Sequence, residues 1–92
     1  MALGLRSLGP NPFVSTTGVM LAIPRAAEAD VRVYDVRGQD VRTLRRGRLE
    51  AGELRIVWDG RDYHGAVAAP GIYFVAARVG SEAARLKIAC VR

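Results

Sequence analysis

The sequence contains very few of the side chains on which enzymes and metal centres usually depend. A single cysteine, Cys90, excludes an internal disulfide, and a single histidine, His64, leaves too few ligands for a zinc site of cysteine and histidine. Because each of these residues stands alone, the common nucleophile–base pairs are missing. An enzyme with this composition would have to work with carboxylates and hydroxyls only.

Long apolar runs and aromatic side chains are also scarce. No stretch approaches the roughly 18 consecutive apolar residues of a membrane-spanning helix. The aromatic residues (one Trp, three Tyr and two Phe) fall mostly at positions that we expect to face inward, so they cannot line a sugar-binding cleft for glycoside hydrolysis. We therefore expect a protein without catalytic residues, cofactor or metal ion.

Positive charge is abundant, with 14 Lys and Arg against 9 Asp and Glu and a net charge of +5. Such a balance can indicate a polyanionic partner. The arginines are, however, spread along the chain and interleaved with acidic residues, so we favour a solvated surface and expect no nucleic-acid partner. The densest group could instead contact a partner protein or lipopolysaccharide phosphate through paired hydrogen bonds. This group consists of Arg42, Arg45, Arg46 and Arg48.

From Thr16 onward, apolar and polar residues alternate in short runs that are separated by Gly, Asp and Pro, a pattern typical of β-strands. A turn is expected at 37–40 and a loop at 47–52. Two alanine- and glutamate-rich pieces, 25–30 and 81–85, are far shorter than the ~12 residues that an independent helix needs. The pattern predicts an all-β fold, an antiparallel β-sandwich of six or seven short strands. The clearest strands are 19–23, 29–36, 41–44, 54–58, 73–79 and 86–90.

The alternation also predicts the core. Trp58 is the largest apolar side chain at an inward position, so we place it at the centre. Cys90 alternates with the inward-facing Leu86 and Ile88, which favours a buried small side chain over a reactive thiol.

The N-terminal part looks different from the rest. Residues 1–15 show no clean period, and Gly9–Pro12 is a cluster of helix and strand breakers. We expect residues 1–15 to be a flexible tail or linker and residues 16–92 to form the domain. The same break, with a single early positive charge, argues against a signal peptide. If the protein is exported, we therefore expect the chain to be a fragment of a longer one.

The best candidates for chemistry are Asp59 and Asp62, which flank Gly60. Their carboxylates could offer oxygen atoms to calcium, but this ion needs six to eight such ligands. Asp side chains also accept hydrogen bonds from nearby backbone N–H groups in turns, and glycine tolerates a positive φ there. We favour the turn over the calcium site.

Other polar motifs indicate structural roles. Tyr73, two residues after Gly71, is placed like the tyrosine whose hydroxyl ties back to the preceding corner in many sandwiches. Tyr34 and Asp35 are expected to end a strand before a turn at Gly38. None of these positions requires a ligand.

Several of these residues occur in one recognisable order. Together they resemble the C-terminal sorting domain of proteins exported by the bacterial type IX secretion system, and they are similar to the related immunoglobulin-like domain of the flagellar hook-capping protein. The resemblance extends over about 10–92, and the Pro-Asn-Pro-Phe start favours the sorting domain. The motif residues are Pro10, Asn11, Pro12, Phe13, Tyr34, Asp35, Gly38, Trp58, Asp59, Gly60, Asp62, Gly65, Gly71 and Tyr73.

The resemblance implies that the fold is an antiparallel immunoglobulin-like β-sandwich of about seven short strands. It also implies a non-catalytic targeting module, fused behind a cargo protein and recognised by the outer-membrane secretion machinery. It also implies passage through the periplasm to the outer membrane, cell surface or medium. We expect a monomer without a small-molecule substrate. The alternatives are an assembly module like that of the hook cap and, third, a calcium- or carbohydrate-binding accessory domain. The residues expected to present the signal on the last hairpin are Leu86, Lys87, Ile88 and Arg92.

Overall fold

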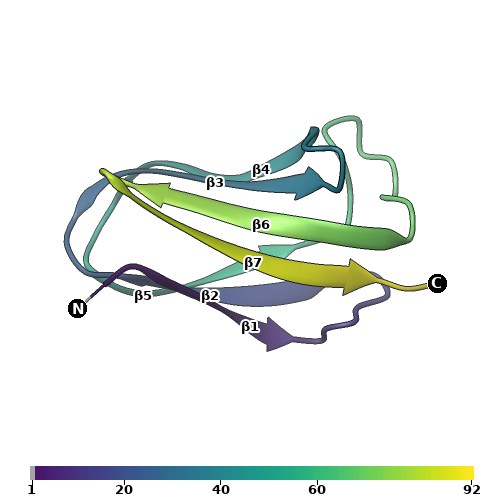
Figure 1. The fold of residues 1–92 in the computed structure, drawn as a ribbon, viewed down its shortest axis with the longest axis horizontal. Coiled ribbons are helices and arrows are strands. Elements are labelled where there is room, and N and C mark those ends of the chain that lie inside the picture. Colours follow the sequence, from purple (N-terminus) through teal and green to yellow (C-terminus); the bar gives the residue numbers. More distant parts are fainter. Residues whose placement is uncertain (1) are drawn as a thin grey trace.

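The computed structural model describes residues 2–92, which form strands and connecting loops (Figure 1). Within this range no helix is long and apolar enough to cross a membrane. The strands are β1 (Gly4–Gly9), β2 (Thr17–Ile23), β3 (Ala27–Asp35), β4 (Asp40–Leu49), β5 (Gly52–Trp58), β6 (Gly71–Val79) and β7 (Glu82–Cys90).

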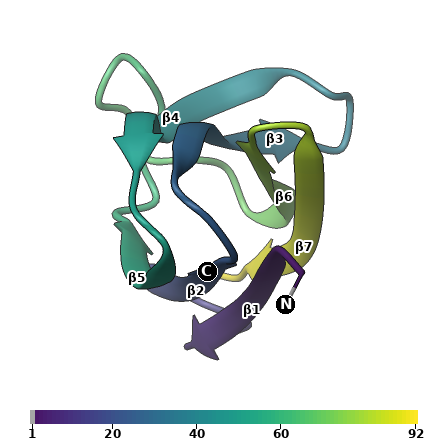
Figure 2. The ribbon, with the colours of Figure 1, turned by 90° about the vertical axis from the view of Figure 1, so that its left-hand side faces the viewer.

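The strands form two sheets that face each other across the core (Figure 2). One sheet has the order β1-β2-β5 and the other has the order β4-β3-β6-β7. Every neighbouring pair of strands within the sheets is antiparallel. The predicted all-β sandwich with seven strands is therefore confirmed.

The core lies where the alternating apolar residues of the two sheets meet. Side chains at every second position of β2, β3 and β6 point inward, because successive residues of a strand face opposite sides. Trp58, at the end of β5, is 2% exposed and lies at the centre of this core, as its position in the sequence predicts. Cys90 is also buried. The other fully buried large side chains are Phe13, Leu21, Ile23, Val31, Val33, Val75 and Ile88.

The prediction that residues 1–15 form a flexible tail or linker is wrong for most of this segment. Gly4–Gly9 forms β1 and pairs with β2, while Leu3 and Leu5 pack against the core. Phe13 is completely buried, although it was expected before the domain begins. An edge strand packs on one neighbour only and has a weak apolar period, so its sequence resembles that of a linker. Met1 lies outside the described residues.

The arginine-rich segment is also different from the prediction. It was expected as a short strand at 41–44 followed by a loop, but β4 continues to Leu49 and only two residues separate it from β5. β4 is the outermost strand of its sheet, and its pairing with β3 shifts register twice. Arg45, Arg46 and Arg48 are exposed along it. A strand with solvent on its outer edge needs little apolar alternation, which explains why the pattern underestimates its length.

Candidate interaction surface

The Pro10–Phe13 segment lies against the end of the last strand, at the end of the molecule that also holds the C-terminus (Figure 1). Phe13 forms a parallel bridge with Cys90: its N–H donates to the carbonyl of Ala89 at 2.8 Å, and its carbonyl accepts from Val91 at 2.8 Å. The peptide bonds before Pro10 and Pro12 are both cis. The motif is therefore attached to the end of β7 by a single bridge at Phe13.

The side chain of Asn11 extends this pairing. Its Oδ1 accepts from the backbone N–H of Ala89 at 3.0 Å, and its Nδ2 donates to the carbonyl of Lys87 at 3.5 Å. The hydroxyl of Thr17 donates to the carbonyl of Pro10 at 2.7 Å, which connects the segment to β2 as well. Residues more than 70 positions apart are thus joined into one surface.

The last residue also binds within the domain. The guanidinium of Arg92 donates to the carbonyls of Ala68 and Val14, the second at 3.3 Å. Three segments therefore meet at this arginine: the loop after β1, the loop before β6 and the C-terminus. The sequence suggested Arg92 as a contact for a partner, but in the structure its side chain connects parts of the same domain.

The remaining predicted contacts of the last hairpin differ in exposure. Ile88 is 1% exposed and belongs to the core, as the alternation predicts, so its side chain cannot be the partner contact that was also suggested for it. Leu86 is partly buried against the core. Lys87 is exposed on the outer side of β7. Only Lys87 of these three presents most of its side chain to solvent, because strand alternation turns its two neighbours inward.

The second predicted contact group, on β4, is not near the first. β4 and β7 are opposite edges of the same four-stranded sheet. Arg42 is also engaged within the domain, because its Nη1 donates to Asp59 Oδ1 at 3.0 Å and to the carbonyl of Arg61 at 3.1 Å. The structure therefore does not combine the two groups into one site.

The Asp59–Asp62 turn is held together by its own side chains. Asp59 Oδ1 accepts from the N–H of Arg61 at 3.0 Å, and the indole N–H of Trp58 donates to the carbonyl of Arg61 at 3.0 Å. Asp62 Oδ1 accepts from the N–H groups of His64 and Ala66 at 2.8 and 3.0 Å. These carboxylates act as turn formers here.

Two glycines shape the same loop. Gly60 has φ +73°, and a Cβ at this position would overlap the carbonyl oxygen of Ser15. Gly65 has φ +79°, and its carbonyl accepts from Arg61. Within residues 2–92, no three His, Cys, Asp or Glu side chains are grouped closely enough to hold a metal ion.

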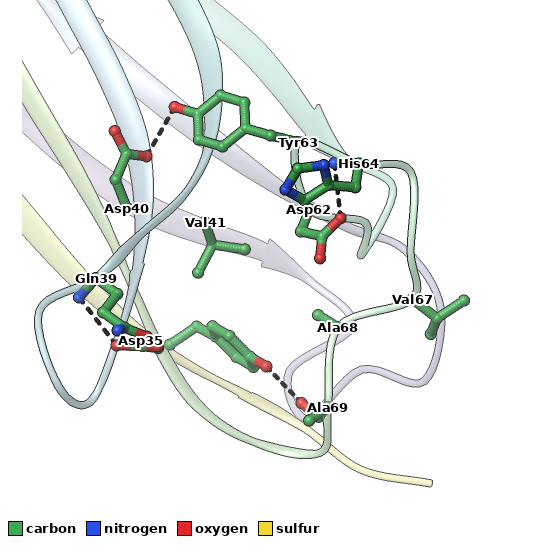
Figure 3. A pocket seen from close by; sticks show the side chains of 11 residues that line it. Asp35, Gln39, Asp40, Val41, Asp62, Tyr63, His64, Val67, Ala68 and Ala69 are labelled. Atoms are coloured by element: carbon green, nitrogen blue, oxygen red, sulfur yellow. Dashed lines mark hydrogen bonds between the residues drawn. The ribbon is translucent and has the colours of Figure 1, made fainter.

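A pocket of about 290 Å³ lies between this loop and the β3–β4 turn (Figure 3). Tyr63 donates to Asp40 Oδ1 at 2.8 Å, which connects the loop to β4. In the turn, Asp35 Oδ1 accepts from the N–H groups of Arg37 and Gln39 at 2.9 and 3.0 Å. The acidic side chains around the pocket thus accept hydrogen bonds that shape its walls. Gly38, with φ +81°, completes the turn.

Tyr73 forms the corner that its position predicts. Its hydroxyl donates to the carbonyl of Ala69, four residues earlier, and connects the start of β6 to the preceding loop. Burial raises the pKa of Tyr73 above its ordinary value, and the nearby Cys90 and Asp35 act in the same direction. Gly71, with φ +149°, begins the strand.

An ion-paired group lies on the outer face of the four-stranded sheet. Arg32 donates to Asp30 at 2.6 and 2.9 Å and to Asp40 at 2.6 Å. The hydrogen bond from Arg32 lowers the pKa of Asp30. Burial opposes this shift, and the charges of Arg32, Arg46 and Arg78 lower the pKa further. Tyr34 lies on the same face, directly opposite Phe74 of β6.

Sequence reasoning missed three contacts of this surface: Asn11 with β7, Arg92 with two loops, and Arg85 with an aromatic ring. The guanidinium carbon of Arg85 lies 4.6 Å from the centroid of Phe74. The Pro-Asn-Pro-Phe motif was a signal for the first contact, but its partner on β7 could not be read from the chain. All three depend on which distant strands become neighbours.

The sequence profile of the FlgD Ig-like domain matches residues 13–82. No curated protein matches the chain. Among solved structures, FlgD from P. aeruginosa has a TM-score of 0.66 at 24% identity and covers 97% of this chain and 74% of its own. FlgD from Xanthomonas campestris, described in relation to hook capping in flagellar assembly, has a TM-score of 0.64 at 24% identity, with 92% of this chain and 60% of that one covered.

The fold also resembles a part of PorZ, a surface component of the type IX secretion system of Porphyromonas gingivalis. The TM-score is 0.61 at 20% identity, and 98% of this chain is covered. The chain corresponds to only 11% of the length of PorZ. At these identities the structural matches establish the sandwich fold.

Proposed function

The chain belongs to the FlgD Ig-like domain family, and we propose that within this fold it is a non-catalytic sorting module that directs an exported cargo protein through the type IX secretion system to the cell surface. The observation that carries the proposal is the pairing of the Pro10–Phe13 segment with the end of β7. The motif that resembles the start of a sorting domain and the final strand form one continuous surface.

The geometry supports recognition of a folded surface. Phe13 and Ile88 anchor the two parts of this surface in the core, so its shape depends on the folded domain and not on a flexible peptide. The fold is shared with a part of PorZ, which is itself a bacterial surface component. The proposed partners are the outer-membrane machinery and a cargo domain fused upstream, with export through the periplasm and the domain acting as a monomer.

The test is export of a reporter fused in front of this chain, behind a signal peptide, in a bacterium with a type IX system. We expect the reporter at the cell surface or in the medium, and retention in the periplasm when the secretion system is deleted. Equal surface display in both strains would contradict the proposal.

Charge reversal then locates the recognised surface without removing core residues. Lys87→Glu on β7 is expected to reduce export at least fivefold. Arg55→Glu, on the outer side of the other sheet, is the matched control. Both side chains are exposed and lie outside the core, but Arg55 is not on the sheet that contains β7, so this variant should export normally. Equal export of the two variants would exclude β7 as the recognised strand.

The family match favours one second candidate, an assembly module like the immunoglobulin-like domain of the hook cap. In this case the sandwich would bind other subunits of a flagellar structure. Co-purification with hook subunits, together with loss of motility when the gene is deleted, would support this candidate over sorting. Retention of motility with loss of cargo export would support sorting.

A further inference from the structure

We propose that the free edge of β7, from Ala83 to Lys87, binds an extended acidic segment of a partner protein, which adds to the sheet as a further strand. This inference deepens the proposed function and rests on it for the partner's biological role. It names the chemistry of the bound segment and the backbone groups that bind it.

The direction of the backbone groups follows from the contacts at the end of β7. In an antiparallel pair, alternate residues of an edge strand point both backbone groups away from the neighbouring strand. Ala89 is such a residue, because its N–H and carbonyl bind Asn11 and Phe13 and not β6. By the same alternation Ala83, Arg85 and Lys87 point outward.

These outward groups form an open row. Along residues 2–92, the N–H groups of Ala83, Arg85 and Lys87 and the carbonyls of Ala83 and Arg85 have no hydrogen-bond partner outside the β6–β7 pairing. The Asn11–Phe13 segment covers only the end of the strand. The open row is therefore about five residues long and has a defined limit at Ala89.

β7 lacks two of the devices by which proteins usually protect an edge, bulges and prolines, although it carries the charged side chains of Arg85 and Lys87. Bulges and prolines interrupt such strands and prevent pairing with other chains. β7 pairs continuously with β6 over nine residues and its sequence contains no proline. At the opposite edge, β4 shifts register twice and is tied to the Asp59 loop by Arg42. The regular β7 edge is thus the better template for strand addition.

The charge of this edge selects an acidic segment. Arg85 and Lys87 lie on the outer side of β7 and, in the described part of the chain, neither is within ion-pair distance of a carboxylate. Contact with Phe74 holds the Arg85 guanidinium above the sheet. Directly opposite side chains of paired strands lie about 5 Å apart, where opposite charges stabilise and like charges destabilise. A second copy of β7 is therefore disfavoured, and acidic side chains two residues apart fit.

The other side of the added strand faces the seam between the sheets. β1 runs alongside β7 there (Figures 1 and 2). Leu5 on β1 and Leu86 on β7 are only partly buried against the core, so an apolar side chain placed between them would remove further surface from water. The bound segment should therefore alternate acidic and apolar residues over about five positions.

The test uses the whole 92-residue chain, labelled with ¹⁵N, and the synthetic peptide Glu-Val-Glu-Val-Glu with blocked ends. We expect saturable shifts of the amide signals of Ala83, Arg85 and Lys87 and at least tenfold slower hydrogen exchange of these amides. The peptide Lys-Val-Lys-Val-Lys should bind at least tenfold more weakly. Absence of shifts at β7, or shifts that follow the exposed arginines of β4 instead, would overturn the proposal.

Matched variants separate the backbone from the charge. Arg85→Ala loses the cation but keeps the outward N–H, and it should weaken binding severalfold. Arg85→Pro loses both the cation and the N–H, so it should abolish binding. The variant should still fold, because proline is tolerated at an edge position whose N–H points to solvent. Equal binding by these two variants would exclude strand addition. If the proline variant does not fold, Arg85→Glu combined with Lys87→Glu should exchange the preference between the two peptides, and an unchanged preference would overturn the proposal.

The outcome is distinguishable from that of the proposed function. Peptide binding with normal export of an Arg85→Pro fusion would establish the docking site and contradict its use in sorting. Normal export of the unaltered fusion without peptide binding would overturn the docking site alone.

Discussion

The ring of Phe13 stands edge-on to the indole of Trp58, with ring centroids 5.4 Å apart and planes at 61°. Tyr73 approaches the same indole at 5.3 Å and 66°. Such edge-to-face pairs stabilise beyond the area that they bury. The three rings come from the N-terminal loop, β5 and β6, so they connect the Pro10–Phe13 segment to both sheets.

Removal of the Phe13 ring should therefore destabilise the whole domain. We expect Phe13→Ala to lower the free energy of unfolding by about 3–5 kcal/mol, the usual cost of truncating a buried Phe. Urea unfolding followed by the fluorescence of Trp58 measures this change. Val14→Ala is the control, because Val14 is 61% exposed and its truncation should change stability by less than about 0.5 kcal/mol. Equal stability of the two variants would contradict the packing of Phe13.

Gly60 should be far more sensitive to substitution than Gly38. Both have positive φ, +73° and +81°, so alanine at either position costs roughly 1–2 kcal/mol of backbone strain. A Cβ at Gly60 would also overlap the carbonyl oxygen of Ser15, whereas a Cβ at Gly38 meets nothing within 4 Å. We expect Gly60→Ala to lower the thermal midpoint clearly more than Gly38→Ala. Equal midpoints would show that the loop adapts without cost.

The hydroxyl of Tyr73 should make the domain sensitive to alkali. Its pKa is raised by burial, so the unfolded chain loses this proton at lower pH than the folded one. The stability that this group contributes is complete below the unfolded pKa near 10 and is lost as pH rises through the folded pKa. Tyr73→Phe should remove this alkaline step and cost about 1 kcal/mol at neutral pH through the lost bond to Ala69. An unchanged alkaline profile in this variant would assign the step to other groups.

Acid should weaken the contact between Asp30 and Arg32. The pKa of Asp30 is lowered in the folded state, so its contribution is present above the unfolded pKa near 4 and is lost as pH falls through the folded pKa. Asp30→Asn should flatten the acid side of a stability profile measured by urea unfolding between pH 2 and 7. The pair is partly exposed, so we expect a change of less than about 1 kcal/mol at neutral pH. Glu50→Gln is the control, since Glu50 is highly exposed, and it should leave the profile nearly unchanged.

The candidate surface was predictable only in part. The Pro-Asn-Pro-Phe motif and the final hairpin could both be recognised from the residues, as could the turn at Asp59–Asp62. Their relationship could not, because Phe13 and Cys90 are distant in the chain and meet only after the sheets have formed. Arg92 shows the same limit, because the loop carbonyls that its side chain binds are distant in the chain.

By itself, the sequence determined the strands that have one buried face, the central position of Trp58 and the turns that contain glycine. These features follow from local causes: side-chain alternation over a few residues and the φ angles that only glycine adopts easily. The tertiary structure alone decided that Gly4–Gly9 is a strand, that β4 extends through the arginine-rich segment, and that β7 lies at the edge of its sheet. Edge strands pack on one neighbour, so their pairing depends on distant partners that no local pattern encodes.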